Sequence, residues 1–214
     1  MAGMIAQHLD GVIEQHNKRP AAVWNSGGND YDRISRSTAD AIEHCVLRLD
    51  PKPGERILDL ATGTGWTSRI VARRGGLVVG VDIAADLLEA AVARAEAENL
   101  EVEYHLGDAE SLPFADGEFD AVVSTFGIMF ASGPEAAASE LARVCRSGGR
   151  IALTTWTSDS NLFRVFEVMR RYMPPSASSA PSPFEWGRTE RMKQLLGSKF
   201  RLRFERGRVV LPRA

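Results

Sequence analysis

Residues 56–67 decide the fold of this chain: Arg56-Ile57-Leu58-Asp59-Leu60-Ala61-Thr62-Gly63-Thr64-Gly65-Trp66-Thr67. This stretch is typical of a buried strand, followed by a glycine-rich turn and the first turn of a helix. A second apolar run, residues 77–82, ends on the acid Asp82. Gly63 and Gly65 let the backbone pass close to a ligand without a Cβ clash, and the helix start offers free N–H groups. Because an acid at the end of the second strand can accept two ribose hydroxyls, the two motifs indicate a nucleoside-like cofactor.

Strands and helices alternate along the rest of the chain. Strands are expected at residues 56–61, 77–82, 101–106, 119–126 and 150–156, and helices at 64–74, at 84–98 and from Pro134 to Gly148-Gly149. The alternation predicts an α/β fold, with a doubly wound, mostly parallel, Rossmann-like sheet and helices on both faces. Ligands of such sheets bind beyond the carboxyl ends of the strands.

The flanking segments divide into a cap, a loop and a late strand. Apolar residues at helical spacing predict a helix over residues 4–16, and residues 1–36 are expected to form an N-terminal helical cap. A helix at 37–49 then opens the Rossmann-like domain of residues 37–214. Proline and serine in residues 174–187 predict a mobile loop. Alternating apolar residues between 202 and 211 predict a late strand or hairpin.

Composition excludes several classes of protein. Among 214 residues, 44% are hydrophobic and 25% charged, as in ordinary globular proteins, and the net charge of −2 gives no general attraction to nucleic acid or to a membrane. No secretory or membrane-spanning run is present, so a cytoplasmic location is expected. His8, His16 and His44 lie on segments expected to be helical and have no partner acids at metal spacing. No metal site is therefore predicted, and His105 is expected at a solvated strand edge.

A third motif follows the third expected strand: Leu106-Gly107-Asp108-Ala109-Glu110-Ser111-Leu112-Pro113-Phe114. Asp108 could accept a hydrogen bond from an exocyclic amine, and the Ala109 N–H could face a ring nitrogen of the same purine. With these three motifs in order, followed by Phe119-Asp120, the chain resembles the class I methyltransferases that use S-adenosylmethionine. The resemblance is to the small-molecule branch known as methyltransferase type 11 or UbiE-like, and it covers roughly residues 24–160.

The resemblance implies an S-adenosylmethionine cofactor, a small-molecule methyl acceptor and in-line methyl transfer. It also implies cofactor-binding roles for residues in all three motifs, in the segment after the fourth expected strand and in the cap. These residues are Tyr31, Asp59, Ala61, Gly63, Gly65, Asp82, Ile83, Asp108, Ala109, Thr125 and Phe126. The family usually has glycine at the position of Ala61, and the turn is expected to survive the extra methyl group. No catalytic residue is predicted, because no convincing general base is present.

In this family the sheet has seven strands, and the chain ends just after the expected sixth. We therefore expect the final strand to be missing, leaving a six-stranded sheet or one completed by a second chain, as in a homodimer. An NAD-dependent oxidoreductase is a rival interpretation, but its Gly-x-Gly-x-x-Gly fingerprint ends here on Ser68, and Asp59 would repel a pyrophosphate. A second rival is a non-catalytic or truncated, inactive S-adenosylmethionine-binding protein. Asp59 and Asp82 could also be plain helix-start acids, and Trp24, Tyr31 and Trp66 plain packing residues.

Overall fold

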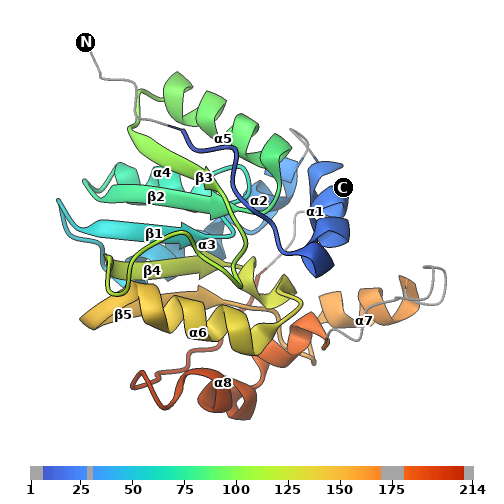
Figure 1. Ribbon diagram of the computed structural model, residues 1–214. Coiled ribbons are helices and arrows are strands. Elements are labelled where there is room, and N and C mark those ends of the chain that lie inside the picture. Colours follow the sequence, from blue (N-terminus) through green and yellow to red (C-terminus); the bar gives the residue numbers. More distant parts are fainter. Residues whose placement is uncertain (1–6, 28–30, 170–180, 210–214) are drawn as a thin grey trace.

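The computed structural model describes residues 7–27, 31–169 and 181–209, and a five-stranded parallel sheet lies at its centre (Figure 1). The strands are β1 (Arg56–Leu60), β2 (Leu77–Asp82), β3 (Val102–Leu106), β4 (Phe119–Thr125) and β5 (Cys145–Thr154). Their order is β3-β2-β1-β4-β5, and all four neighbouring pairs are parallel. The doubly wound architecture expected from the sequence is confirmed. The order reverses between β1 and β4, which is where ligands of such sheets bind.

Helices cover both faces of the sheet and stand at the carboxyl ends of its strands. They are α1 (Lys18–Asn25), α2 (Asp32–Ser37), α3 (Ala39–Leu49), α4 (Trp66–Ala72), α5 (Ala85–Ala97), α6 (Pro134–Val144), α7 (Asn161–Met169) and α8 (Thr189–Leu196). Short 3-10 turns are η1 (Gln15–Asn17), η3 (Ile128–Phe130) and η4 (Pro183–Gly187). In Figure 1, α5 lies on one side of the sheet, α6 and α8 lie on the other, and α1 and α7 stand beyond the arrowheads. None of the helices described is long and apolar enough to cross a membrane.

Two cores follow from the alternation of side chains along the strands. Ile57 packs with α3, α4 and α5 on one face, and Leu58, one residue later, packs with α6, α8 and η4 on the other. Both leucine and isoleucine are fully buried. Because successive residues of a strand point to opposite faces, strands covered on both sides must be apolar throughout. That is why β1, β2 and β4 read as nearly continuous apolar runs.

The segment before α1 is the main departure from the sequence-based expectation. Residues 7–14 are not helical, while residues 4–6 lie outside the described residues. His8 pairs in parallel with His105 of β3: its N–H donates to the Tyr104 carbonyl over 2.9 Å, and its carbonyl accepts from the Leu106 N–H over 2.8 Å. The Gln7 side-chain oxygen also accepts from the Tyr104 N–H. An otherwise unpaired edge of β3 recruits this segment, and these bonds outweigh its helical spacing.

Two further segments differ from expectation. β5 begins at Cys145, opposite Phe119, rather than at residue 150. Residues 201–209, expected to begin a late strand, contain none, and Glu205 instead pairs with Arg48 of α3 over 2.5 Å. Residues 210 and 211 lie outside the described residues. The sheet therefore has five strands over the described residues, not six.

The expected mobile loop is corrected in its last part. Residues 183–187 form η4, where Phe184 and Trp186 are buried in the core beside α8. Burial of two aromatic side chains holds this part against the sheet because each removes a large apolar area from water. Residues 174–180 of that expected loop lie outside the described residues.

Candidate functional site

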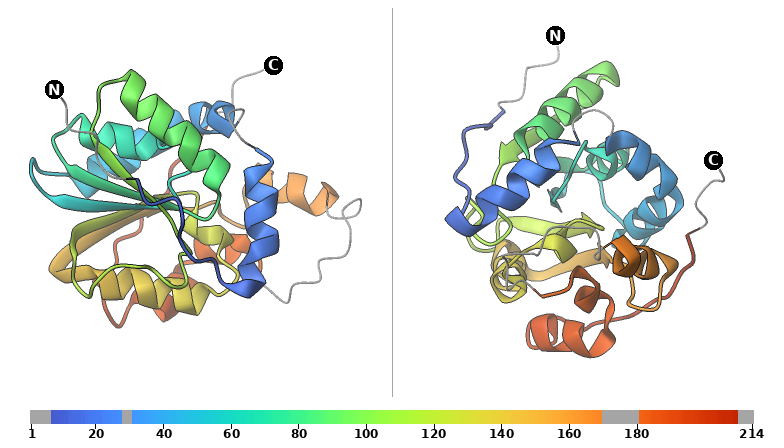
Figure 2. Two further views of the ribbon diagram at one scale, coloured as in Figure 1. Left: turned by 45° about the horizontal axis from the view of Figure 1, so that its top comes forward. Right: turned by 90° about the vertical axis from the view of Figure 1, so that its right-hand side faces the viewer.

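A cavity of about 390 Å³ opens at the carboxyl ends of the strands, the end that faces the viewer in the right-hand panel of Figure 2. Nine of the eleven residues assigned to cofactor binding from the sequence line it: Tyr31, Ala61, Gly63, Asp82, Ile83, Asp108, Ala109, Thr125 and Phe126. Asp59 and Gly65 do not. The strand tips therefore bring all three sequence motifs to one hollow.

The turn after β1 forms the floor of the cavity. Ala61, Gly63 and Gly65 all have positive φ, at 56°, 56° and 73°. Positive φ favours glycine, which explains the family's usual glycine at position 61, yet the turn forms with alanine there. A Cβ on Gly65 would lie 2.3 Å from the Tyr104 hydroxyl oxygen. Gly65 is therefore required for packing beneath the turn, and it does not line the cavity.

Asp59 lies beneath the same turn and holds its shape. Its Oδ2 accepts hydrogen bonds from the hydroxyls of Thr62 and Ser68, each over 2.7 Å. Burial raises the pKa of Asp59 to about 6, against the opposing effect of these two bonds. Asp59 thus positions the turn and does not line the cavity.

Asp82 connects the tip of β2 to the turn. Its Oδ2 accepts the Gly63 N–H over 2.7 Å, and its Oδ1 accepts the Ala84 N–H over 3.0 Å. Burial raises the pKa of Asp82 to about 6. A carboxylate offers about four acceptor positions, and the backbone N–H groups do not use all of them, so Asp82 can still accept from a donor in the cavity.

The N-terminal segment contacts the third acid, a feature with no signal in the sequence. Asp108 Oδ2 accepts from Asn17 Nδ2 over 2.9 Å and from the Glu14 N–H over 3.2 Å, while Oδ1 accepts the Glu110 N–H over 3.0 Å. Asn17 is buried and lines the cavity. It comes within reach only because residues 7–14 follow the edge of β3. No motif could have identified it.

Tyr31 covers the turn from the side of α2. A Cβ on Gly63 would lie 3.3 Å from its ring. Trp24 meets Tyr31 edge-on at 6.0 Å and Phe130 at 4.9 Å between ring centroids. Burial raises the pKa of Tyr31 to about 12, and the nearby charge of Asp82 adds to the shift. The tyrosine is therefore neutral at physiological pH.

The cavity also has apolar lining residues that were not predicted as a set. After β4, Phe126 stacks on Trp156 with ring centroids 4.7 Å apart. The further aromatic and aliphatic residues of the lining include Pro20, Trp24, Phe130, Trp156, Leu162 and Phe166. Leu162 and Phe166 come from α7, whose apolar spacing was not used in the sequence analysis. The cavity thus combines acidic, hydrogen-bonding side chains with aromatic ones.

The charge of the lining distinguishes between cofactor classes. Asp82, Asp108 and Glu110 line the cavity, whereas no lysine or arginine does so among the described residues. A dinucleotide pyrophosphate would meet carboxylates with no compensating cation. An adenosyl sulfonium, by contrast, carries a positive charge, ribose hydroxyls that donate to an acid and a purine amine that donates to another. The residues present fit S-adenosylmethionine, and the sheet order is consistent with the class I methyltransferase fold.

Comparison with known proteins agrees with this class. Residues 58–153 match the family model described as a methyltransferase domain. An uncharacterised protein of Mycobacterium tuberculosis is 41% identical over 145 residues, covering 68% of this chain and 53% of that protein. A demethylmenaquinone methyltransferase of Corynebacterium kroppenstedtii is 33% identical over 152 residues, covering 69% of this chain and 64% of the relative. The chain thus spans less than two thirds of the length of either relative.

A solved structure extends the agreement to the fold. Phosphoethanolamine N-methyltransferase 2 of Haemonchus contortus, in complex with S-adenosylmethionine, matches with a TM-score of 0.58 at 24% identity, covering 75% of this chain and 36% of that chain. Residues 58–153 are thus similar to the methyltransferase-domain family, and the neighbour solved with S-adenosylmethionine shares the fold of this chain.

Proposed function

We propose that this chain is a methyltransferase that transfers the methyl group of S-adenosylmethionine to a small, largely apolar acceptor. The observation that carries the proposal is the convergence of Asp82, Asp108 and the Gly63 turn on one cavity that contains carboxylates but, among the described residues, no basic side chain. These residues are suited to the adenosyl part of the cofactor. The aromatic side chains of the lining are suited to the acceptor.

The cofactor supplies an electrophilic methyl group on a positively charged sulfur. The chain's own residues have to bind the cofactor and the acceptor, orient them toward each other and exclude water. Asp82 would accept hydrogen bonds from the ribose hydroxyls. Asp108 and the Ala109 N–H would bind the edge of the adenine, and Ile83 would pack against the face of the adenine ring. Holding the acceptor in line with the reacting carbon can supply on the order of 7–11 kcal/mol of the barrier.

The side chains that line the cavity support a class of methyl acceptor. Trp24, Phe130 and Trp156 offer flat apolar surfaces, and α7 adds Leu162 and Phe166. No histidine lines the cavity among the described residues, and Tyr31 is neutral. These features support an uncharged acceptor whose reacting atom is nucleophilic without a strong protein base. The demethylmenaquinone methyltransferases among the relatives add weight to a small organic acceptor.

Two linked measurements test the proposal. Calorimetric titration with S-adenosylhomocysteine is expected to show one site per chain, and NADH is expected not to bind. Incubation with methyl-labelled S-adenosylmethionine and a panel of apolar phenols, quinols and amines is then expected to label at least one acceptor. Absence of S-adenosylhomocysteine binding would overturn the proposal as a whole. Binding without transfer to any acceptor would instead support a non-catalytic cofactor-binding protein.

A further inference from the structure

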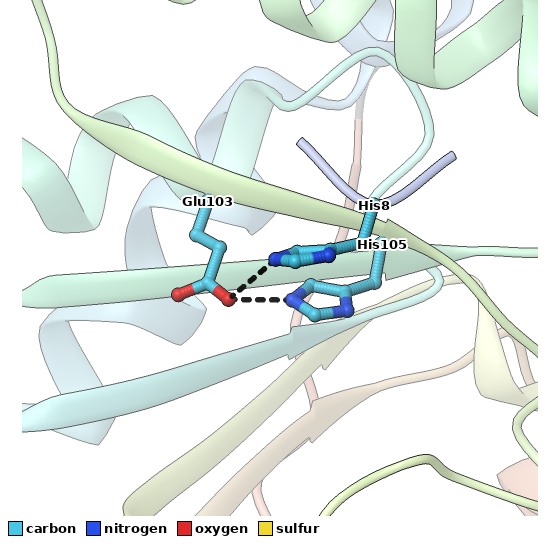
Figure 3. Close-up of side chains that lie close together, drawn as sticks. All are labelled: His8, Glu103 and His105. Atoms are coloured by element: carbon cyan, nitrogen blue, oxygen red, sulfur yellow. Dashed lines mark hydrogen bonds and ion pairs between the residues drawn. The ribbon is translucent and has the colours of Figure 1, made fainter. Parts of the chain in front are cut away.

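Three side chains that are not part of the cavity converge at the outer edge of the sheet. The Nε2 atoms of His8 and His105 both face Oε1 of Glu103, at 3.8 Å and 2.6 Å (Figure 3). The possible ligand atoms of the three residues all lie within 4.8 Å of one another. Two imidazoles and one carboxylate are a donor set typical of Zn²⁺. From these three residues, which we call the edge triad, we propose a divalent transition-metal site that takes Zn²⁺ at the junction of the N-terminal segment and β3.

The backbone places the edge triad before any metal arrives. Glu103 and His105 are two residues apart on β3 and therefore point to the same face. His8 is the parallel bridge partner of His105, and its two backbone hydrogen bonds to β3 fix its register. A one-residue slip would turn the His8 side chain to the other face. The site is thus preorganised by strand pairing between residues almost a hundred positions apart.

The exposure of His8 makes the edge triad accessible to a metal ion and to an exchangeable ligand. The His8 side chain is 50% exposed, against 24% for Glu103 and 14% for His105. The two imidazole rings stack with centroids 4.4 Å apart and an interplanar angle of 25°. Zinc–nitrogen bonds are about 2.0–2.1 Å long and lie in the ring plane. Binding therefore requires the exposed His8 ring to turn out of the stack, and water would take the fourth position.

The charges around the edge triad favour binding through one carboxylate oxygen. Arg56 Nη1 lies 3.7 Å from the other oxygen, Glu103 Oε2, while Arg56 Nη2 pairs with Glu118 Oε1 at 3.0 Å. Oε1 is the oxygen that both histidines face, and it is free of this arginine contact. Because Arg56 also pairs with Glu118, the positive charge of Arg56 at the site is partly compensated. A monodentate carboxylate and two imidazoles would then hold the ion.

The site has a structural consequence for the cavity. The segment that carries His8 continues to Glu14 and Asn17, both of which donate to Asp108. A metal ion bridging His8 to β3 would pin this segment. We therefore expect bound Zn²⁺ to raise the melting temperature and to reduce the hydrogen exchange of residues 8–17, whether or not the chain transfers methyl groups.

Metal binding by untagged, chelator-treated protein tests the site directly. Titration with ZnCl₂ is expected to show one equivalent bound per chain, and Co²⁺ is expected to give the visible absorption of a nitrogen- and oxygen-ligated ion. His8→Gln and Glu103→Gln should each weaken Zn²⁺ binding at least about tenfold, comparable to the effect of disrupting the surroundings of a metal site. His8→Gln leaves the core intact, because this side chain is half exposed.

His44 provides a matched control, since it also faces a carboxylate, with its Nε2 3.4 Å from Glu205 Oε1, but stands outside the edge triad. His44→Gln is expected to bind Zn²⁺ as the wild type does. The proposal is overturned if the wild type takes up no saturable zinc, or if His8→Gln binds as tightly as the wild type. A loss of binding in His44→Gln alone would place the ion elsewhere and also overturn it.

Discussion

The carboxylate of Asp82 accepts a hydrogen bond from the Gly63 N–H over 2.7 Å, so the tip of β2 fixes the turn that follows β1. This bond joins the two motifs that were recognised separately in the sequence. Asp82 is buried, at 7% exposure, and lines the cavity. One residue therefore shapes the turn and presents acceptors to the site.

Replacing this acid is expected to weaken cofactor binding. Asp82→Asn keeps the shape of the side chain but removes the charge, and hydrogen bonds to charged groups contribute about 1.5–3 kcal/mol. We expect S-adenosylhomocysteine affinity to fall about tenfold or more, measured by calorimetric titration. Asp86→Asn, at an exposed position four residues further on, is the control and should bind normally. Equal affinities in all three proteins would contradict the role given to Asp82.

The raised pKa of Asp82 also predicts a pH dependence of stability. Its pKa is about 6 in the folded chain and about 3.9 when unfolded. Between these values the folded chain holds a proton that the unfolded chain has lost, so this contribution to stability falls as the pH rises through 6. A shift of about two pKa units corresponds to on the order of 3 kcal/mol.

Asp82→Asn removes this dependence. In urea denaturation, the free energy of unfolding of the variant minus that of the wild type is expected to be larger at pH 7.5 than at pH 5. As the pH falls, the wild type should become more stable relative to the variant, because the buried carboxyl of Asp82 becomes neutral. Asp59 titrates in both proteins, so its contribution largely cancels in the difference. A difference that stays constant with pH would show that Asp82 is not the group responsible.

Gly127 packs against Ala61, so the effects of substitutions at these two positions on stability are expected to be coupled. A Cβ at position 127 would lie 2.4 Å from the Ala61 Cβ and 2.8 Å from the Ala61 carbonyl oxygen. Gly127→Ala is therefore expected to cost about 1–3 kcal/mol of stability, as overpacking does. Adding Ala61→Gly removes the methyl clash and suits the φ of 56°, so it should recover part of that loss.

Urea denaturation of the two single variants and the double variant measures this coupling. The recovery is expected to be partial, because the clash with the carbonyl oxygen remains. Costs that simply add would mean that residues 61 and 127 do not meet in the folded chain.

A substitution of Asp32 tests how Tyr31 is held over the turn. Its Oδ1 accepts from the Thr64 hydroxyl over 3.1 Å and lies 3.2 Å from Arg94 Nε and 3.9 Å from Arg69 Nη2. Asp32→Asn removes the negative charge that faces these arginines at the start of α2. We expect S-adenosylhomocysteine affinity to fall about tenfold, about 1.4 kcal/mol, because Tyr31 would no longer be fixed beside Gly63.

Asp40→Asn is the matched control, since Asp40 is an exposed acid in the first turn of α3. It should leave both affinity and stability nearly unchanged. If Asp32→Asn binds the ligand like the control, α2 is held by other contacts.

The sequence by itself determined the five strands, the helices between them and nine of the residues that line the cavity. Apolar runs ending on Asp82 and Asp108, and glycines at 63 and 65, are local patterns, and right-handed parallel connections bring such strand ends to one edge. That is enough to gather Ala61, Asp82, Asp108 and Phe126.

Only the tertiary structure decided the contacts that depend on a distant partner. The open edge of β3 draws residues 7–14 out of a helix, and this pairing carries Asn17 to Asp108 and His8 to His105. The tertiary structure likewise places Asp59 beneath the turn and not at the cavity, and there the hydroxyls of Thr62 and Ser68 donate to its Oδ2. No local pattern encodes these outcomes, because each is set by the free energy of pairing or burying groups far apart in the chain.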